Sequence, residues 1–243
     1  MAKFEVCCHK FADLSEYAYG VSILNESKYG FATVGNVMRL SLLRSPKAPD
    51  GNADMGHHKI KWAILPHKGA LGHETVIAAF NFNNPLKLVG KSAAESGEEK
   101  GRRGNLERFP IRLTGDENLV LDWIKRGEDD ADVSTDALPK KIQRTVIVRI
   151  YDALGGMGRG VVECAWDVKK VSKTNILEDD LEEIAVQKAE GGATFEVQLG
   201  QFEVATYKIT LEGWDAFELK VGRRLLDASA WVQVISFPIS VSA

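Results

Sequence analysis

The chain has 243 residues, of which 44% are hydrophobic, and a formal net charge of −3 with a pI near 6.0. This is enough to bury a core in one large all-β domain or two smaller ones. The acidic balance disfavours nucleic acid as a partner, because phosphate binding needs a basic surface. No apolar run approaches the ~20 residues of a membrane span, so no membrane is expected as a partner.

The N-terminal residues lack the apolar stretch of a signal peptide, which predicts a cytoplasmic protein. The three cysteines are Cys7, Cys8 and Cys164. Neighbouring residues on a strand point to opposite faces, so Cys7 and Cys8 are not expected to form a disulfide. This use of cysteine suits a reducing compartment.

Short apolar segments that alternate with turn residues predict β-strands along the first half of the chain. After the first strand, residues 12–20 read as a turn, and the four residues NESK connect the second strand to the third. The segment TVIAAFNF at residues 75–82 is rich in β-branched and aromatic residues, which favours a strand. The expected strands cover residues 4–11, 19–24, 29–34, 37–44, 60–65 and 75–82.

A polar loop lies between the strands at residues 37–44 and 60–65, where two prolines and two glycines prevent a continuous ladder. Polar groups on a loop that two strands hold are a common form of binding surface. The candidate binding residues of this segment are Arg44, Lys47, Asp50, Asp54, His57 and His58.

In the second half, strands are expected at residues 109–113, 118–125, 144–151 and 161–171, and 195–199 pairs with 204–211 as a hairpin. Residues 173–184 could hold one helical turn that Asn175 caps. The acidic segment 126–143 reads as a surface linker. We therefore predict a first β-domain at residues 1–125, a linker at 126–143 and a small β-sandwich at 144–212. The tail at 213–243 differs, with a short helix near 217–228 and an apolar strand at 231–237.

No motif in the chain forms a catalytic constellation. The five histidines lack the spacing of a zinc site, and GGMGRG does not open a helix, so a β-turn is favoured over phosphate binding. The pairs Asp129–Asp130 and Asp179–Asp180 lie in acidic runs, where solvation is the better explanation. Asp13, Glu16, Asp50 and Asp54 could hydrogen-bond sugar hydroxyls, although fixing their own loops is favoured. Three tryptophans could stack on sugar rings, but on alternating strands the core is their more common place; they are Trp62, Trp123 and Trp166.

Several long runs carry a resemblance to a known family. They include FEVCCHKFADLSEYAYGVSILNESKYGF, GNVMRLSLLRSPKAPDGNADMGHHKIKWAILPH, VRIYDALGGMGRG and FEVATYKITL. Over residues 4–211 the chain resembles the C-terminal β-region of class II α-mannosidases. These enzymes form glycoside hydrolase family 38, and the match is to their fungal cytosolic–vacuolar branch, which adds the vacuole, reached without a signal peptide, as a second location.

The resemblance implies an all-β fold, a galactose-mutarotase-like β-supersandwich followed by a smaller C-terminal β-sandwich. In the family this region packs on an N-terminal half that carries the zinc, its ligands, the nucleophile and the general acid of a retaining reaction. This chain has no counterpart of those positions, so it is expected to hold no zinc, no other cofactor and no catalytic residue. A family loop at the rim of the active site matches this chain's polar loop, which makes Arg44, Asp50 and Asp54 the expected substrate-binding residues.

The chain begins where the family's catalytic half should end and runs past Leu211, so it is expected to be a fragment of a longer enzyme. Its expected partners are mannose-containing glycans, the catalytic half and, from the family's oligomers, further copies of itself. The first hypothesis is the C-terminal portion of an α-mannosidase of mannose catabolism, inactive alone. The alternative is a self-sufficient, lectin-like carbohydrate-binding β-sandwich.

Overall fold

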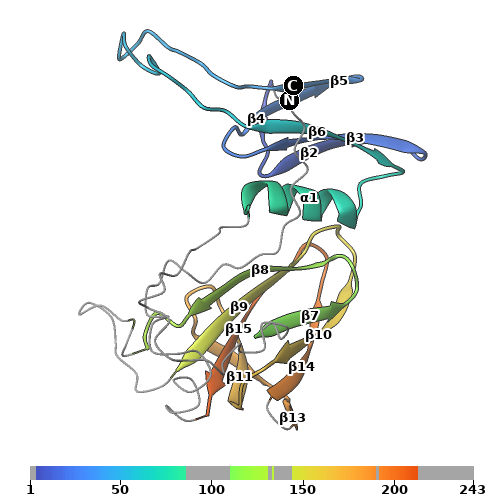
Figure 1. The fold of residues 1–243 in the computed structure, drawn as a ribbon, viewed down its shortest axis with the longest axis vertical. Coiled ribbons are helices and arrows are strands. Elements are labelled where there is room, and N and C mark those ends of the chain that lie inside the picture. Colours follow the sequence, from blue (N-terminus) through green and yellow to red (C-terminus); the bar gives the residue numbers. More distant parts are fainter. Residues whose placement is uncertain (1–3, 86–109, 131–132, 134–143, 190–191, 213–243) are drawn as a thin grey trace, which may run out of the picture. The chain divides into compact units, whose positions relative to one another are not determined.

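The computed structural model describes residues 4–85, 110–130, 133, 144–189 and 192–212. The chain divides into two compact units, which are treated separately below. Unit 1 comprises Met1–Lys87 and Val234–Ala243, and unit 2 comprises Leu88–Gln233. Among the described residues, unit 1 holds strands β1 to β6 and helix α1, and unit 2 holds strands β7 to β15 (Figure 1).

Unit 1 contains two three-stranded antiparallel sheets. The first has the order β1-β4-β5, with β1 at Val6–Cys7, β4 at Gly30–Val34 and β5 at Val37–Leu40. The second has the order β2-β3-β6, with β2 at Phe11–Ser15, β3 at Tyr19–Asn25 and β6 at Trp62–Lys68. In Figure 1 helix α1, at His73–Asn83, and the sheet β1-β4-β5 lie on opposite sides of β2-β3-β6.

Helix α1 replaces the strand that the sequence predicted at residues 75–82, so this prediction was wrong. The buried residues of the helix are Thr75, Val76, Ala79 and Phe80. These positions follow the 3.6-residue period of a helix. The helix therefore covers β3 with one face only. The helix ends where the Asn84 N–H donates to the Phe80 carbonyl, one residue before Pro85.

Unit 2 is a sandwich of two antiparallel sheets. The four-stranded sheet has the order β13-β14-β10-β7, and its strands span Gln187–Ala189, Gly192–Leu199, Gly158–Cys164 and Ile111–Gly115. The five-stranded sheet has the order β12-β11-β15-β9-β8, and its strands span Asp180–Ile184, Val168–Thr174, Val204–Leu211, Thr145–Asp152 and Leu119–Arg126.

The core of unit 2 lies between these sheets. Alternate residues of β9, β14 and β15 point inward, as the period of two predicts. The rings of Phe195 and Tyr207 meet with centroids 5.6 Å apart. Strands β14 and β15 therefore face each other across the core, and the expected hairpin between them is not formed, because the turn at residues 200–203 carries the chain from one sheet to the other.

The division between the units differs from the one that the sequence predicted at residues 126–143. Strands β7 and β8 pair with β10 and β9, so they belong to the sandwich. The acidic segment begins with a structural connection rather than a linker. Asp130 is fully buried, and its carboxylate accepts hydrogen bonds from the Thr145 N–H at 2.6 Å, the Thr145 hydroxyl at 2.9 Å and Arg126 Nη2 at 3.0 Å. Solvation was thus the wrong explanation for this aspartate.

Three smaller predictions also differ. The first strand is split into β1 and β2, and β2 includes four residues that were read as a turn. The long strand at 161–171 is β10 and β11, which are separated where Trp166 enters the core. Residues 175–179 form a turn without a helix, and Asn175 Oδ1 accepts the N–H groups of Leu177 and Asp179. The remaining prediction, the tail at 213–243, lies outside the described residues.

The all-β class that the sequence predicted is confirmed, since the described parts of the chain are antiparallel sheets with α1 as their one α-helix. Within these parts, no helix has the length and apolar character that crossing a membrane requires.

Candidate functional site

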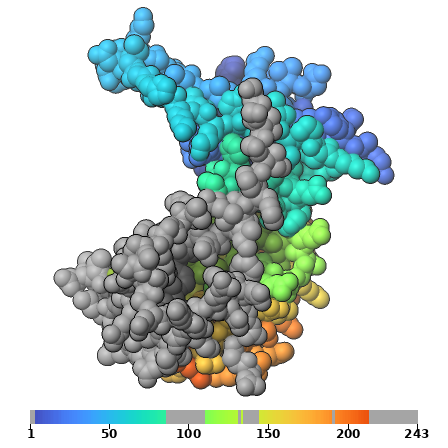
Figure 2. Space-filling view, in the orientation of Figure 1, coloured from blue at the N-terminus to red at the C-terminus, as the bar shows by residue number. Residues whose placement is uncertain are grey.

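The polar segment between β5 and β6, residues 41–61, extends from the sheets of unit 1 as an arm (Figures 1 and 2). We call it the 41–61 arm. Most of its side chains are exposed, which includes Arg44, Lys47, Asp50, Asp54 and His57. Its polar groups are therefore available to a ligand or to another surface.

Hydrogen bonds within the 41–61 arm hold its conformation. The Ser45 hydroxyl donates to the Ala53 carbonyl at 2.8 Å, and Asp50 Oδ1 accepts the Asn52 N–H at 2.9 Å. His58 Nε2 lies 2.8 Å from the carbonyl oxygen of Asp54 and donates to it. These three contacts each close a local turn, so the arm is organised by its own polar groups.

The three predicted binding residues have different surroundings. Asp50 fixes its own turn, which was the favoured explanation for this residue. Asp54 has a left-handed backbone with φ of 57°, and its carbonyl rather than its carboxylate meets His58. Arg44 is exposed and makes no hydrogen bond or ion pair with the described part of the chain. All three residues lie on the 41–61 arm. Of their charged groups, only the Asp50 carboxylate accepts a hydrogen bond within the arm.

A buried polar cluster lies between the sheet β2-β3-β6 and α1, toward the end of β6 that is away from the 41–61 arm. Asp13 Oδ2 on β2 accepts hydrogen bonds from His67 Nε2 on β6 and from the Ser22 hydroxyl on β3, both at 2.6 Å. The side chains of His67 and Asp13 are only 6% and 7% exposed. The Ser22 hydroxyl is also 3.3 Å from that of Thr75 on α1. One carboxylate thus joins three strands, and through Ser22 also the helix.

Gly20 makes the contact between β6 and β2 possible. It pairs with His67 in the ladder and with Ser15 on its other side, so the imidazole must cross the backbone of β3 to reach Asp13. A Cβ atom at Gly20 would lie 2.2 Å from His67 Cε1. Only glycine leaves the space in which the imidazole lies.

The charged state of Asp13 follows from these contacts. Burial alone would raise the pKa of its carboxyl, but hydrogen bonds from Ser22, Ser15 and His67, together with the charge of His67, outweigh burial and lower the pKa. The serine hydroxyl donates to the carboxylate and not to the imidazole, so the cluster does not activate a nucleophile. Its chemistry is that of a structural anchor.

Sequence reasoning considered Asp13 and His67 separately and missed their contact. They are 54 residues apart, and no local pattern links them. The available signal was Gly20 in the middle of a β-prone run, since such a glycine often marks a close approach.

The remaining candidates have ordinary roles. Trp166 lies in the core as expected, whereas Trp62 and Trp123 are about half exposed, so the core was the wrong place for them. All three cysteines are free. In the described ranges, no group of three or more His, Cys, Asp or Glu side chains could hold a metal ion.

Comparison with known proteins gives this fold its family. Residues 1–52 match the glycosyl hydrolases family 38 C-terminal domain, and residues 118–207 match the family 38 C-terminal beta sandwich domain. The α-mannosidase of Saccharomyces cerevisiae is 44% identical over 86% of this chain and 19% of the relative. Human α-mannosidase 2C1 is 49% identical over 63% of this chain and 13% of the relative. The chain thus spans less than a fifth of the length of these relatives.

The β-sandwich of unit 2 and the two matched domains define an all-β C-terminal region of a glycoside hydrolase. The chain belongs to glycosyl hydrolase family 38, as part of the C-terminal region of the class II α-mannosidases.

Replacing Gly20 by alanine should expel the His67 imidazole from its place over β3. We expect Gly20→Ala to reduce the free energy of opening of β2 and β6 by about 1–3 kcal/mol, as overpacking does elsewhere. Hydrogen exchange of the amides in these strands measures it. The matched control is Gly51→Ala, where the nearest atom to a new Cβ is 3.9 Å away. Equal exchange in both variants would contradict the role of Gly20.

The lowered pKa of Asp13 predicts a pH dependence of stability. The stabilisation is complete above the ordinary aspartate pKa of 3.8 and is lost as the pH falls through the lower folded-state value. Urea unfolding at a series of acidic pH values measures this, and the difference between the wild type and Asp13→Asn isolates it from other carboxylates. That difference should shrink as the pH falls, and a constant difference would refute the prediction.

Proposed function

We propose that this chain is the non-catalytic C-terminal portion of a retaining α-mannosidase of mannose catabolism, and that it presents the 41–61 arm to a glycan held by the catalytic half. The observation that carries the proposal is the arm itself. It is exposed and held by its own hydrogen bonds, and it displays Arg44 with a guanidinium that no described residue engages. A preorganised polar loop loses little entropy when it binds.

The chemistry of the arm suits sugar hydroxyls. A guanidinium offers several N–H donors in a fixed fork, and the Asp54 carboxylate accepts from paired hydroxyl groups. Asp50 contributes by fixing the turn between them. The reaction itself needs a nucleophile and a general acid, and we assign both to the catalytic half, so the isolated chain should not hydrolyse a chromogenic α-mannoside.

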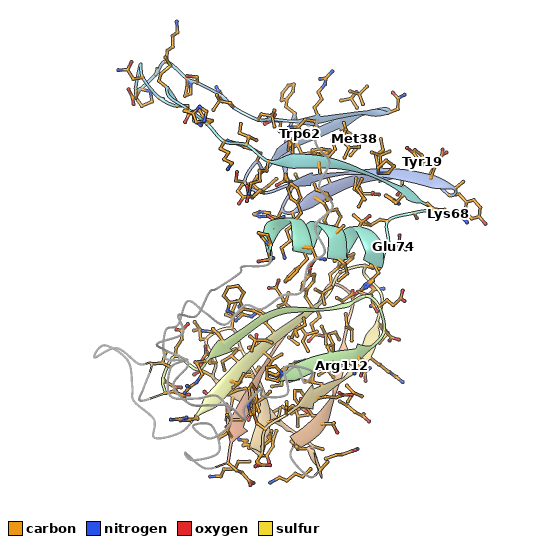
Figure 3. The ribbon with its side chains drawn as sticks, in the orientation of Figure 1. Tyr19, Met38, Trp62, Lys68, Glu74 and Arg112 are labelled. Atoms are coloured by element: carbon orange, nitrogen blue, oxygen red, sulfur yellow. The ribbon has the colours of Figure 1, made fainter. Side chains whose placement is uncertain are left out.

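The partner in this proposal is the remainder of the enzyme, and exposed apolar side chains of β3 and β6 support it. Tyr19, Trp62 and Ile64 are each about half exposed, and Figure 3 labels Tyr19 and Trp62. Exposed aromatic and aliphatic groups on one sheet face are typical of a contact surface.

A chimera tests the role of the arm. This chain replaces the matching region of the Saccharomyces α-mannosidase, and Arg44→Ala is introduced. We expect kcat/KM for an oligomannoside to fall by about 10- to 100-fold, because a hydrogen bond to a charged group is worth about 1.5–3 kcal/mol.

The control for the arm is Lys47→Ala, which removes an exposed cation from the same segment. It should leave kcat/KM unchanged. A chimera in which Arg44→Ala is as active as the parent would overturn the assignment of Arg44.

The second candidate function is a self-sufficient glycan-binding module, and the exposed Trp62 and Tyr19 favour it. Aromatic faces of this kind can stack on sugar rings. Calorimetric titration of the isolated chain with oligomannose should then show weak binding that Trp62→Ala removes and Trp123→Ala, a similarly exposed tryptophan of unit 2, preserves. Absence of heat at millimolar sugar would exclude this candidate.

A further inference from the structure

One end of the unit 2 sandwich carries a cluster of exposed apolar side chains. Three turns contribute to it, at residues 153–157, 175–179 and 200–203, together with the start of β15. Its members are each between 59% and 79% exposed, which is unusual for five large apolar residues in neighbouring turns. We call it the apex patch, and it consists of Met157, Ile176, Leu177, Phe202 and Val204.

The contacts of the turns place these side chains together. A Cβ at Gly155 would lie 2.3 Å from Phe202 Cζ, so the Phe202 ring lies against the turn that carries Met157. Thr174 pairs with Thr206 in the ladder, and therefore the residues after Thr174 run beside Val204. The ion pair of Lys173 with Glu203, at 2.8 Å, joins the same two segments.

A buried carboxylate holds two of the turns in place. Asp152 accepts the Phe202 N–H at 2.7 Å, the Asn118 side-chain amide at 2.7 Å and the Leu154 N–H at 3.3 Å. Burial alone would raise the pKa of Asp152, but these hydrogen bonds lower it and keep the group ionised. Phe202 itself has a left-handed backbone with φ of 54°. The backbone that carries the exposed ring is thus fixed by a polar arrangement.

The third turn is held in the same manner. Asn175 Oδ1 accepts two N–H groups of the turn, and Glu178, with φ of 70°, is buried beneath it. The Glu178 carboxylate meets Lys125 at 2.7 Å, and its carbonyl accepts from Lys208 Nζ at 2.6 Å. Ile176 and Leu177 are therefore displayed by a turn that is anchored on both sides. Rigid display lowers the entropy lost on association, as at well-formed interfaces.

The charges around the apex patch restrict its partner. Apart from the buried Asp152 and Glu178, the turns and strand ends that border it carry five carboxylates, of Asp116, Glu117, Asp179, Asp180 and Glu203, against two cations, Lys173 and Arg159. A second copy of this end would bring two acidic rims together, which is unfavourable. The complementary surface is an apolar recess bordered by lysine or arginine.

We infer that the apex patch docks into such a basic-rimmed apolar recess on the part of the α-mannosidase polypeptide that lies outside this chain. This inference rests on the proposed function. The yeast relative has more than four-fifths of its length outside the matched region. A covalently attached surface is present at a high effective concentration, so it has the advantage over any separate protein.

Hydroxyl-radical footprinting of the isolated chain and of the chimera described above tests the docking. In the isolated chain Met157 and Phe202 should react as exposed side chains. In the chimera their modification should fall about five-fold or more, as expected for side chains that pass from exposed to buried positions at an interface core. The control is Leu181 on β12, which is 67% exposed outside the patch and should react equally in both.

Two variants extend the test. Phe202→Asn keeps a residue that tolerates the left-handed backbone, and together with Leu177→Asn it should restore Met157 modification in the chimera and leave the isolated chain's unfolding unchanged. Leu181→Asn should leave both the protection of Met157 in the chimera and the unfolding of the isolated chain unchanged. Raising the salt concentration should also expose Met157 in the chimera, because the rim is charged.

Equal modification of Met157 and Phe202 in the isolated chain and the chimera overturns the inference, as does protection in the isolated chain. This result is separable from the proposed function. An active, Arg44-dependent chimera with an unprotected patch removes only the docking, whereas a protected patch with no effect of Arg44 removes only the role of the arm.

Discussion

The contact between Asp13 and His67 is the constraint on which unit 1 depends. It joins the first and last strands of the sheet β2-β3-β6 by crossing the middle strand at Gly20, and Ser22 extends it to the helix. Removing the imidazole would leave a hydrogen bond of the buried carboxylate unmade, which costs about 1–3 kcal/mol or more. The same contact fixes the strand into which the 41–61 arm returns. The strand that follows the exposed, polar arm is therefore held by a buried carboxylate near the end of the strand that is away from the arm.

Unit 2 uses carboxylates in the same way. Asp130 closes the connection from β8 to β9, and Asp152 gathers the turns at the opposite end of those strands. Each accepts backbone N–H groups that a turn would otherwise leave without a partner. Both aspartates are thus engaged in holding connections. The surfaces that remain for function are the ones these connections display, the arm in unit 1 and the turns in unit 2.

The sequence predicted the strands well where one face is buried, because alternation is a direct consequence of that geometry. Strands β9 and β15 are within a residue of their predicted bounds. The strand predicted at residues 75–82 was wrong, because β-branched and aromatic residues favour a strand whereas the buried positions recur with the period of a helix. The pairing of β14 and β15 fails for another reason. A four-residue turn is equally compatible with a hairpin and with a crossing between sheets, and only the core decides between them.

The candidate site shows the same limit. The arm and its polar residues follow from prolines and glycines between two strands, and the Asp50 turn follows from local chemistry. The Asp13–His67 contact could not be derived, because it depends on a register that places residues 13, 22 and 67 in neighbouring strands. Local sequence patterns thus identify the polar groups that a loop exposes. The long-range strand register decides which polar groups form buried hydrogen bonds that stabilise the fold. In this chain that division separates the aspartates of the strands, which act as anchors, from the arginine of the arm, which has no structural task among the described residues.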